Sequence, residues 1–212
     1  MKSLKQSMLL YVVTDRTWLN GKTLSSQVEQ AAAAGATCVQ LREKELGYEG
    51  FLAEAKSIKA ITDRYGIPLI VNDSIDVALA CGADGVHIGQ GDMPACKARK
   101  LIGDGRILGV SAQTAAQALA AQRCGADYLG VGAVFPTSTK ADADAVSYDT
   151  LKAICAAVDI PVVAIGGITA ANIASLAGSG IDGVAVVSAV FASPDIPRAT
   201  GELLQSVRQV VV

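Results

Sequence analysis

The chain has 212 residues, of which 51% are apolar and 18% are charged, and its formal net charge at pH 7 is −2. This length favours one large domain over residues 1–212, and the apolar content is ample for a hydrophobic core. A slightly acidic chain lacks the basic face that a general nucleic-acid binder needs. No apolar run reaches the ~20 residues of a membrane-crossing helix, so we expect neither nucleic acid nor a membrane as partner.

The N-terminal apolar run and the cysteines bear on whether the chain has a signal peptide, a zinc site or a disulfide scaffold. The apolar run 8–13 follows Lys2 and Lys5, but it is too short for a signal peptide and predicts a first strand instead. The five cysteines are odd in number, are scattered and form no C-x-x-C pair, which argues against a zinc knuckle or a disulfide scaffold. We expect them to be small buried apolar side chains in a reducing compartment; they are Cys38, Cys81, Cys96, Cys124 and Cys155.

Short apolar runs alternate with longer Ala-rich stretches of helical period. The β-branched runs are typical of buried parallel strands, and they predict strands at residues 9–14, 38–42, 68–71, 85–88, 107–110, 128–131, 161–165 and 183–187. The stretches between them predict helices at residues 24–34, 48–65, 74–81, 114–123, 148–158, 170–177 and 197–210. Together these elements make eight β-then-α units.

Four similar turns repeat in phase with these units, at residues 34–37, 81–84, 124–127 and 179–182. Each has a glycine that can end the preceding helix with a positive φ, and each is followed by a predicted strand. The repeat favours a single (β/α)8 TIM barrel over a doubly wound open sheet. The first strand is not followed by G-x-G-x-x-G, which also argues against a dinucleotide-binding fold.

In a barrel of this kind the chemistry takes place at the carboxyl ends of the strands. Cationic side chains at these ends can neutralise a polyanion, and Asp73 and Asp92 are oxygen ligands that suit Mg²⁺. Glycines after the seventh strand can hold a monophosphate on backbone N–H groups. The sequence therefore predicts a diphosphate site with Mg²⁺ beside a monophosphate site. The polar residues at the strand ends are Gln40, Arg42, Lys44, Asn72, Asp73, Asp92, Ser111, Thr137, Thr139, Lys140 and Ser188.

Several of these residues, and the glycines after the seventh strand, also have a purely structural interpretation. Arg42 could pair with Glu43 or Glu45 on the surface, and Asp92 could cap a helix that begins near Met93. The segment 137–140 could be a plain solvated loop, and the glycine pair 166–167 could be an ordinary turn. Position at a strand end favours the functional interpretation for Arg42 and leaves the two roles of Asp92 open.

Three further residues have structural alternatives. Asn72 and Asp73 could cap the helix that starts at Ser74. His87 is the only histidine, and its apolar strand neighbours favour a packed, hydrogen-bonded side chain over a catalytic base. Because there is no second histidine, the sequence argues against His-based metal sites and against Ser-His-Asp triads. The cysteines have no His partner in a nucleophile pattern, which argues against thiol catalysis.

Several motifs in this order and spacing resemble the thiamine-phosphate synthase (thiamine-phosphate pyrophosphorylase) family along nearly the whole chain. They are YVVTD (11–15), QLREK (40–44), VND (71–73), DGVHIGQGDMP (84–94), GVS (109–111), FPTSTK (135–140), IGGI (165–168) and VVS (186–188). The resemblance implies a cytoplasmic alkyl transferase of thiamine biosynthesis. Such an enzyme joins 4-amino-2-methyl-5-hydroxymethylpyrimidine diphosphate to a thiazole phosphate, or its carboxylated form, by dissociative, Mg²⁺-assisted loss of diphosphate.

The resemblance also implies a role for each matching residue. The pyrimidine diphosphate would be held by Gln40, Arg42, Lys44, Asn72 and Lys140, with Ser111 contacting the diphosphate or the reactive side of the pyrimidine. Mg²⁺ would be held by Asp73 and Asp92. The thiazole phosphate would be held by Thr137, Thr139, Gly167, Val187 and Ser188. The catalytic residues would be Arg42, Lys44, Ser111 and Lys140.

Three other functions fit the sequence less well. The thiazole tautomerases also resemble the chain, but we expect them to carry a His just after the fifth-strand serine, where Gln113 stands here. An epimerase would need an acid–base pair that a single histidine makes hard to find, and a non-catalytic binder would have lost the carboxylates or the cations. Ala133 stands where relatives often have proline, which puts only the rigidity of the following loop in question. The sequence leaves a homo-oligomer open.

Overall fold

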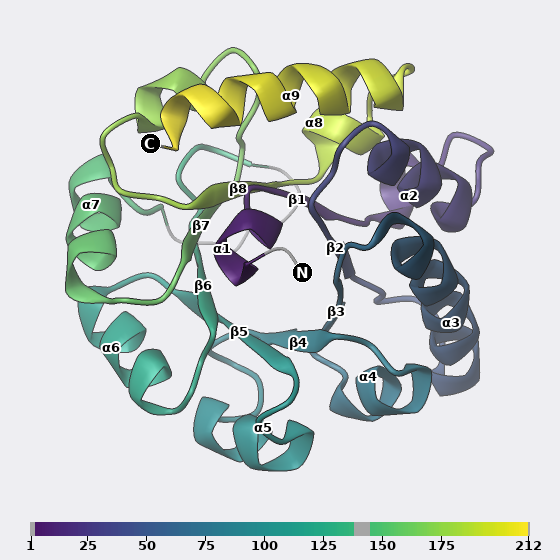
Figure 1. Cartoon of the computed structure of the whole chain (residues 1–212), viewed down its shortest axis with the longest axis horizontal. Helices are drawn as coiled ribbons and strands as arrows, with labels where there is room; N and C mark the ends of the chain where they lie inside the picture. Colours follow the sequence, from purple (N-terminus) through teal and green to yellow (C-terminus); the bar gives the residue numbers. More distant parts are fainter. Residues whose placement is uncertain (1–2, 138–144, 212) are drawn as a thin grey trace.

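The computed structural model describes residues 3–137 and 145–211. Eight parallel strands form a closed barrel in sequential order, which confirms the predicted TIM-barrel fold (Figure 1). The predicted strand ends differ from the observed ones by at most two residues. The strands are β1 (Leu10–Val13), β2 (Cys38–Leu41), β3 (Leu69–Asn72), β4 (Gly85–Ile88), β5 (Ile107–Ala112), β6 (Tyr128–Val131), β7 (Val162–Ile165) and β8 (Gly183–Val186).

Helices surround the barrel, and most begin at a Ser, Thr or Asp whose side chain accepts a backbone hydrogen bond, as N-caps usually do. The longest are α2 (Leu24–Ala33), α3 (Tyr48–Tyr65), α4 (Ile75–Cys81), α5 (Ala95–Ile102), α6 (Ala115–Arg123), α7 (Tyr148–Ala157) and α9 (Ile196–Val210). Shorter pieces are α1 (Leu4–Ser7), η1 (Arg16–Trp18), η2 (Ile173–Leu176) and α8 (Ser188–Phe191). Within the described ranges, no helix is both long and apolar enough to span a bilayer.

The predicted helix at 170–177 is wrong in type, because only the 3₁₀ turn η2 forms there. The Asn172 side chain bonds the preceding backbone at two points, accepting from Thr169 N and donating to Gly167 O, each at 2.8 Å. Ser175 Oγ donates to the carbonyl of Asn172 at 2.7 Å. These local bonds compete with the helical pattern, so the helix does not extend.

The four repeated turns have a shared structural role at the amino-terminal end of the barrel. The fourth residue of each turn accepts a hydrogen bond from a backbone N–H in the first two residues of the preceding strand, at 2.7–2.8 Å. Each turn therefore ties two neighbouring strands together. The acceptors are the side chains of Thr37, Asp84, Asp127 and Asp182, and the donors are the N–H groups of Leu10, Leu69, Leu108 and Val162.

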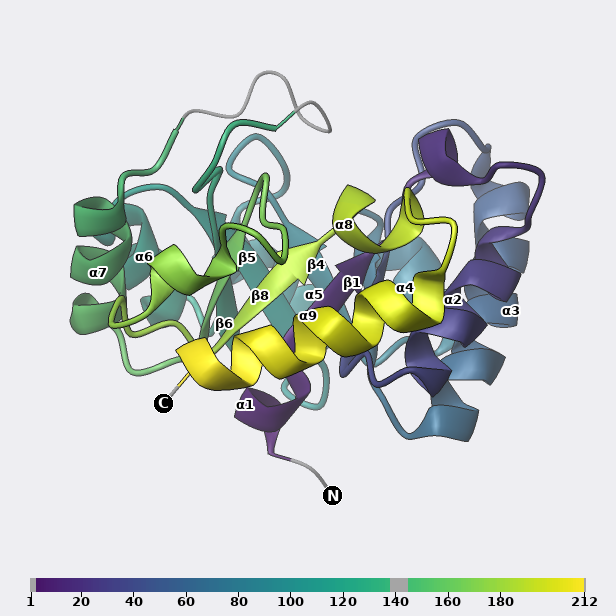
Figure 2. The same ribbon diagram turned by 90° about the horizontal axis from the view of Figure 1, so that it is seen from above.

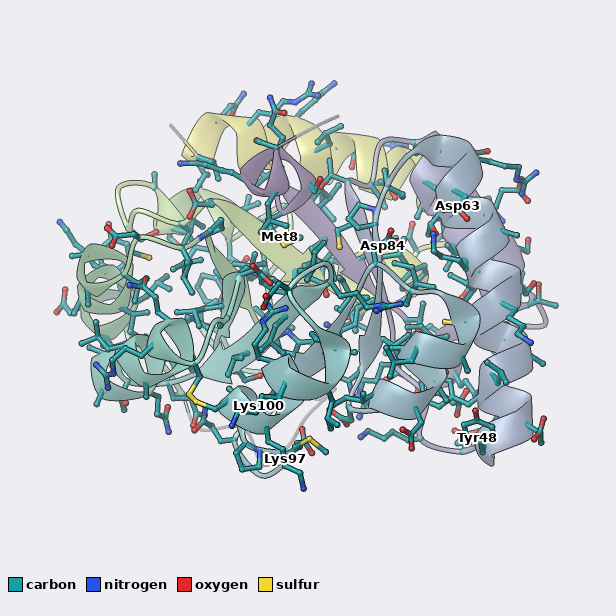
Figure 3. The ribbon with its side chains drawn as sticks, turned by 60° about the horizontal axis from the view of Figure 1, so that its bottom comes forward. Met8, Tyr48, Asp63, Asp84, Lys97 and Lys100 are labelled. Atoms are coloured by element: carbon teal, nitrogen blue, oxygen red, sulfur yellow. A yellow bond between two sulfur atoms is a disulfide. The ribbon has the colours of Figure 1, made fainter. Side chains whose placement is uncertain are left out.

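The amino-terminal end of the barrel is covered by α1, which lies over the barrel axis in Figure 1 and on one side of the barrel in Figure 2. Met8, which follows α1, is completely buried in the barrel interior with Tyr11 and Tyr128, and Leu4 packs against this cluster. Figure 3 shows Met8 and Asp84 toward the same end of the molecule, with Tyr48, at the start of α3, toward the other. The carboxyl end is therefore where the barrel opens.

The cysteines depart from the prediction. Cys96, which is exposed on α5, and Cys124, at the end of α6, form a disulfide with a Cα–Cα distance of 4.5 Å, visible as a yellow bond in Figure 3. The expectation of five unpaired, buried thiols is wrong because the pair is 28 residues apart in sequence and meets only when adjacent helices pack. Of the other three, Cys38 is buried, whereas Cys81 and Cys155 are half-buried.

Candidate active site

A cavity of about 410 Å³ lies at the carboxyl ends of the strands, and all eight strands contribute residues to its wall. Closure of the barrel therefore brings most of the predicted site residues together. Those that line it are Gln40, Arg42, Lys44, Asn72, Asp73, Asp92, Ser111, Thr137 and Val187. Gly167 and Ser188 each follow a lining residue in sequence, Gly166 and Val187. Thr139 and Lys140 lie outside the described residues.

Arg42 follows β2 and pairs with Asp15, with 3.1 Å between its Nη1 and Oδ2 of the aspartate. Its backbone N–H donates to Thr14 Oγ1 at 3.0 Å, which ties the end of β2 to the loop after β1. The alternative of a surface pair with Glu43 or Glu45 is therefore wrong. A guanidinium has five N–H donors, so Arg42 can keep its bond to Asp15 and still bind an anion in the cavity.

Glu43, between the two predicted cationic residues, points away from the cavity and fixes this loop. It accepts hydrogen bonds from the backbone N–H of Glu45 (2.6 Å) and Leu46 (3.0 Å) and from Arg16 Nε (2.5 Å). Burial works against its charge, but these bonds outweigh it and hold the pKa of Glu43 below its ordinary value. Sequence reasoning missed Arg16 and this role of Glu43. The alternation that turns Arg42 and Lys44 inward could have indicated that Glu43 faces the other way.

Lys44 Nζ lies 2.5 Å from Asp73 Oδ2, so the cation after β2 meets the carboxylate after β3. Asp73 has a positive φ of 61°, an uncommon conformation outside glycine. The capping alternative for Asn72 and Asp73 is wrong, because Ser74 is the N-cap of α4 and its own hydroxyl accepts from Val77 N.

Asp92 follows β4, and its Oδ2 accepts from Gly89 N at 2.7 Å. The alternative that it caps α5 is wrong, because α5 begins after Pro94 without a side-chain cap. Burial raises the pKa of Asp73, and a hydrogen bond and the charge from Asp92 raise it further, against the effect of Lys44. The two carboxylates are therefore close enough to repel.

Such a pair fits a hard divalent cation. Mg²⁺ commonly binds one or two carboxylates and completes its shell with water and substrate phosphates, and it would relieve the repulsion between Asp73 and Asp92. In the part of the chain that the structure describes, no cluster of three or more His, Cys, Asp or Glu residues could hold a metal. An ion here would accordingly depend on a phosphorylated ligand for further oxygens.

His87 lies in the floor of the cavity, is 9% exposed, and is packed and hydrogen-bonded as predicted. Its Nδ1 is 2.9 Å from the Tyr128 hydroxyl and its Nε2 is 3.0 Å from Ser111 Oγ. The Tyr128 hydroxyl is 2.8 Å from that of Tyr11, which accepts from Gln40 Nε2 at 2.8 Å. Sequence reasoning missed both tyrosines, because in a strand they look like ordinary core residues.

The loops after β7 and β8 form the opposite wall. Gly166 and Gly167 have φ values of 102° and 63°, a region that favours glycine. A Cβ at Gly167 would lie 2.3 Å from the carbonyl oxygen of Pro136, so the loop after β7 packs closely on the loop after β6. Ser188 is exposed at the first residue of α8, directly after Val187 in the cavity wall.

The chain is similar to known proteins over most of its length. Residues 10–190 match the family model described as thiamine monophosphate synthase. The chain is 54% identical to the thiamine-phosphate synthase of Ruminiclostridium cellulolyticum over 205 residues, 97% of each chain. It is 54% identical to that of Clostridium tetani over 194 residues, 92% of this chain and 93% of that one.

A solved structure extends the similarity to three dimensions. The thiamine phosphate pyrophosphorylase from Pyrococcus furiosus superposes with a TM-score of 0.91 at 40% sequence identity, covering 99% of this chain and 100% of that one. Sequence and fold therefore agree over nearly the full length. The chain belongs to the thiamine-phosphate synthase family, the transferases of thiamine biosynthesis.

Proposed function

We propose that the protein condenses 4-amino-2-methyl-5-hydroxymethylpyrimidine diphosphate with a thiazole phosphate to give thiamine phosphate and diphosphate. The observation that carries the proposal is the composition of one cavity wall. Cations from the loop after β2 face carboxylates from the loops after β3 and β4. That combination suits a diphosphate with a divalent cation, and family membership supports the same chemistry.

In this proposal the diphosphate binds at the wall formed by the loops after β2 and β3. Arg42, Lys44 and Asn72 supply the hydrogen-bond donors, and Lys140 joins them from outside the described residues. Lys44 exchanges part of its pairing with Asp73 for the ligand's phosphate oxygens. The pyrimidine ring extends to the floor, where Gln40 meets it, and Ser111 contacts the diphosphate or the reactive side of the ring.

Asp73 and Asp92 would hold Mg²⁺ in this proposal. The bound ion would offset the negative charge that accumulates on diphosphate as it leaves. The protein's cations serve the same end, and they are fixed before the reaction starts: Asp15 holds Arg42, and Glu43 holds the loop that carries both cations. Such preorganised charges are effective because they need no rearrangement as charge develops.

The second substrate binds on the opposite wall. Its phosphate meets backbone N–H groups and hydroxyls after β6, β7 and β8, which are those of Thr137, Thr139, Gly167, Val187 and Ser188. The close packing of Gly167 on Pro136 joins the two loops that form this phosphate site. The cavity therefore aligns the thiazole nitrogen with the pyrimidine methylene carbon, which makes the coupling effectively unimolecular.

The proposed reaction is dissociative. The bond between the methylene carbon and the diphosphate oxygen breaks first, and its electron pair leaves with diphosphate. The amino group of the pyrimidine ring delocalises the positive charge, and the lone pair of the thiazole nitrogen then forms the new carbon–nitrogen bond. No proton has to be removed, which agrees with a floor histidine that is engaged in hydrogen bonds rather than aimed as a base.

A two-substrate assay tests the proposal. Diphosphate release and thiamine phosphate formation are followed with both substrates and Mg²⁺, and then with each component omitted in turn. We expect product only when all three are present. Tautomerisation of a thiazole carboxylate phosphate without condensation would instead assign the protein to the isomerase branch, in which Asp73 and Asp92 have no metal to hold.

A further inference from the structure

A continuous chain of hydrogen bonds crosses the floor of the cavity. It runs from Gln40 on β2 through Tyr11 on β1 and Tyr128 on β6 to His87 on β4, and ends at Ser111 on β5, with every step between 2.8 and 3.0 Å. Its two ends are residues predicted to touch substrate. Its three middle members were assigned no role by the sequence, and all three are buried.

The direction of the hydrogen bonds is fixed by its first member. The amide nitrogen of Gln40 can only donate, so the Tyr11 oxygen accepts. The Tyr11 hydrogen then has the Tyr128 oxygen 2.8 Å away as its acceptor. Since the Tyr128 oxygen accepts from Tyr11, its own hydrogen is directed to Nδ1 of His87, 2.9 Å away.

The donor and acceptor roles of the two His87 ring nitrogens follow from the Tyr128 hydroxyl. A neutral histidine carries its proton on one nitrogen and accepts on the other. If Nδ1 accepts from Tyr128, the proton is on Nε2 and is donated to Ser111 Oγ, 3.0 Å away. The serine oxygen is then an acceptor within the hydrogen-bonded chain, which leaves its own hydrogen to be donated to a ligand in the cavity that Ser111 lines. At the opposite end, the amide nitrogen of Gln40 is used within the hydrogen-bonded chain, which leaves its amide oxygen as an acceptor for such a ligand.

We propose that Tyr11, Tyr128 and His87 are positioning residues that hold this chain in one direction. In this state His87 is neutral with its proton on Nε2, Gln40 presents an acceptor to the substrate, and Ser111 presents a donor. The consequence for substrate rests on the proposed function. An acceptor at one end suits the amino group of an aminopyrimidine, and a donor at the other suits an oxygen of the leaving diphosphate.

The surroundings of the two phenols favour a neutral chain. Burial raises the pKa of Tyr11 and of Tyr128 well above the ordinary value. The hydrogen bond between the two hydroxyls raises the pKa of Tyr11 and lowers that of Tyr128. Neither phenol therefore ionises near neutral pH, and the order of donors is kept.

The tautomer of His87 provides a direct test, because the protein has a single histidine and its ring signals can be assigned without ambiguity. A long-range ¹H–¹⁵N correlation spectrum of the full-length protein, recorded without substrates, distinguishes the protonated ring nitrogen from the unprotonated one, and coupling to Hδ2 identifies Nε2. We expect Nε2 to be protonated and Nδ1 unprotonated at neutral pH. A proton on Nδ1 would mean that the chain runs in reverse, and a proton on both nitrogens would mean that it is not neutral. Either result overturns the proposal.

Removing one hydroxyl from the middle of the chain tests whether the chain sets the tautomer. In Tyr128→Phe, Nδ1 loses its donor, so we expect the two nitrogen signals to move toward each other and kcat to fall on the order of tenfold. Tyr148→Phe is the matched control: this hydroxyl donates to Ala177 O outside the cavity, and its loss should change neither reading. A Tyr128→Phe spectrum identical to that of the wild type would refute the proposal.

A second variant and a substrate-free spectrum allow the inference to be tested separately from protein folding and from the proposed function. If Tyr128→Phe does not fold, Tyr11→Phe interrupts the chain one step earlier and the wild-type tautomer stands as its own test. The spectrum needs no substrate, so a protein with the Nε2 proton and no condensation activity would fail only the proposed function. An active enzyme with the Nδ1 proton would fail only the inference about the hydrogen-bonded chain.

Discussion

Both ends of the barrel carry ion pairs between a Lys or Arg and an Asp, but the pairs have a different role at each end. At the amino-terminal end, each pairing aspartate also accepts a strand N–H, so the pair ties strands together; these pairs are Lys59–Asp84, Arg99–Asp127 and Lys5–Asp182. At the carboxyl end, Arg42–Asp15 and Lys44–Asp73 join loops around the cavity, and both cations line it.

The comparison shows that residue type alone does not separate structure from function. An aspartate bonded to a strand N–H cannot move away without breaking the tie between two neighbouring strands, whereas a cation beside a cavity can exchange part of its pairing for a ligand. The amino-terminal pairs should therefore govern stability and the carboxyl-terminal pairs turnover.

The largest expected effect is kinetic. Replacing Arg42 by alanine removes a preorganised charge from the proposed diphosphate site, and we expect kcat/KM to fall roughly a hundredfold or more while the folded state is kept. Steady-state kinetics and thermal unfolding measure the two properties on one preparation. Arg198→Ala is the matched control, since Arg198 pairs with Glu202 on the outer helix α9, and it should change neither. Normal turnover of a folded Arg42→Ala variant would disprove the diphosphate assignment.

At the amino-terminal end of the barrel we expect a loss of stability with little change in turnover. In Asp127→Ala, the N–H of Leu108 loses its acceptor and Arg99 loses its carboxylate, which should lower the free energy of unfolding by about 1–3 kcal/mol. Urea unfolding measures the loss, and kcat of the folded enzyme should stay close to that of the wild type. Asp63→Ala provides a control, because Asp63 pairs with Lys59 but sits on an outer helix. An equal loss in both variants would contradict the strand-tying role of Asp127.

The smallest expected effect is a pH dependence in the carboxylate pair. The pKa of Asp73 is raised above its ordinary value, so folding favours its protonated form. The stability that it contributes is present at low pH and is lost as the pH rises from the unfolded to the folded pKa. Without metal, Asp73→Asn should therefore gain stability relative to the wild type over that rise, and urea unfolding at several pH values measures the difference.

Magnesium should reverse this difference, because binding requires the charged carboxylate. Adding Mg²⁺ together with inorganic diphosphate at the higher pH should stabilise the wild type more than Asp73→Asn, and the affinity for Mg²⁺ should fall as the pH drops through the raised pKa of Asp73. Asp92→Asn should behave like Asp73→Asn toward Mg²⁺. Equal stabilisation of all three proteins by Mg²⁺ would show that the ion binds elsewhere.

Much of the fold could be predicted from sequence, because its signals are local. The helix α3 was predicted at its observed bounds, since its apolar period is uninterrupted up to Gly66, which ends it with a positive φ of 60°. The strands followed from β-branched runs, and the barrel followed from their number and from the repeated turns. Most strand-end residues could then be placed in one cavity, because closure of a parallel barrel brings all its carboxyl ends together.

What the sequence did not reveal depends on contacts between distant residues. Tyr11 and Tyr128 are 117 positions apart, and their hydroxyls meet only when β1 and β6 face each other across the closed barrel. Arg16 and Glu43 come from different loops, and the cysteine pair spans two helices. In each case the side chain has no unusual sequence context, and its partner lies in a different strand, loop or helix. The periodic pattern of a sequence does not show which of these elements come into contact.

Because α1 covers the amino-terminal end of the barrel, ligands can enter and leave only from the other end. With Met8 and the tyrosines filling the interior beneath the cavity, substrates and products pass through the carboxyl-end opening. A molecule held at the walls then stands between solvent and anything bound on the floor. A thiazole phosphate that arrives first would obstruct the pyrimidine, so an excess of the second substrate should slow the reaction by forming a dead-end complex.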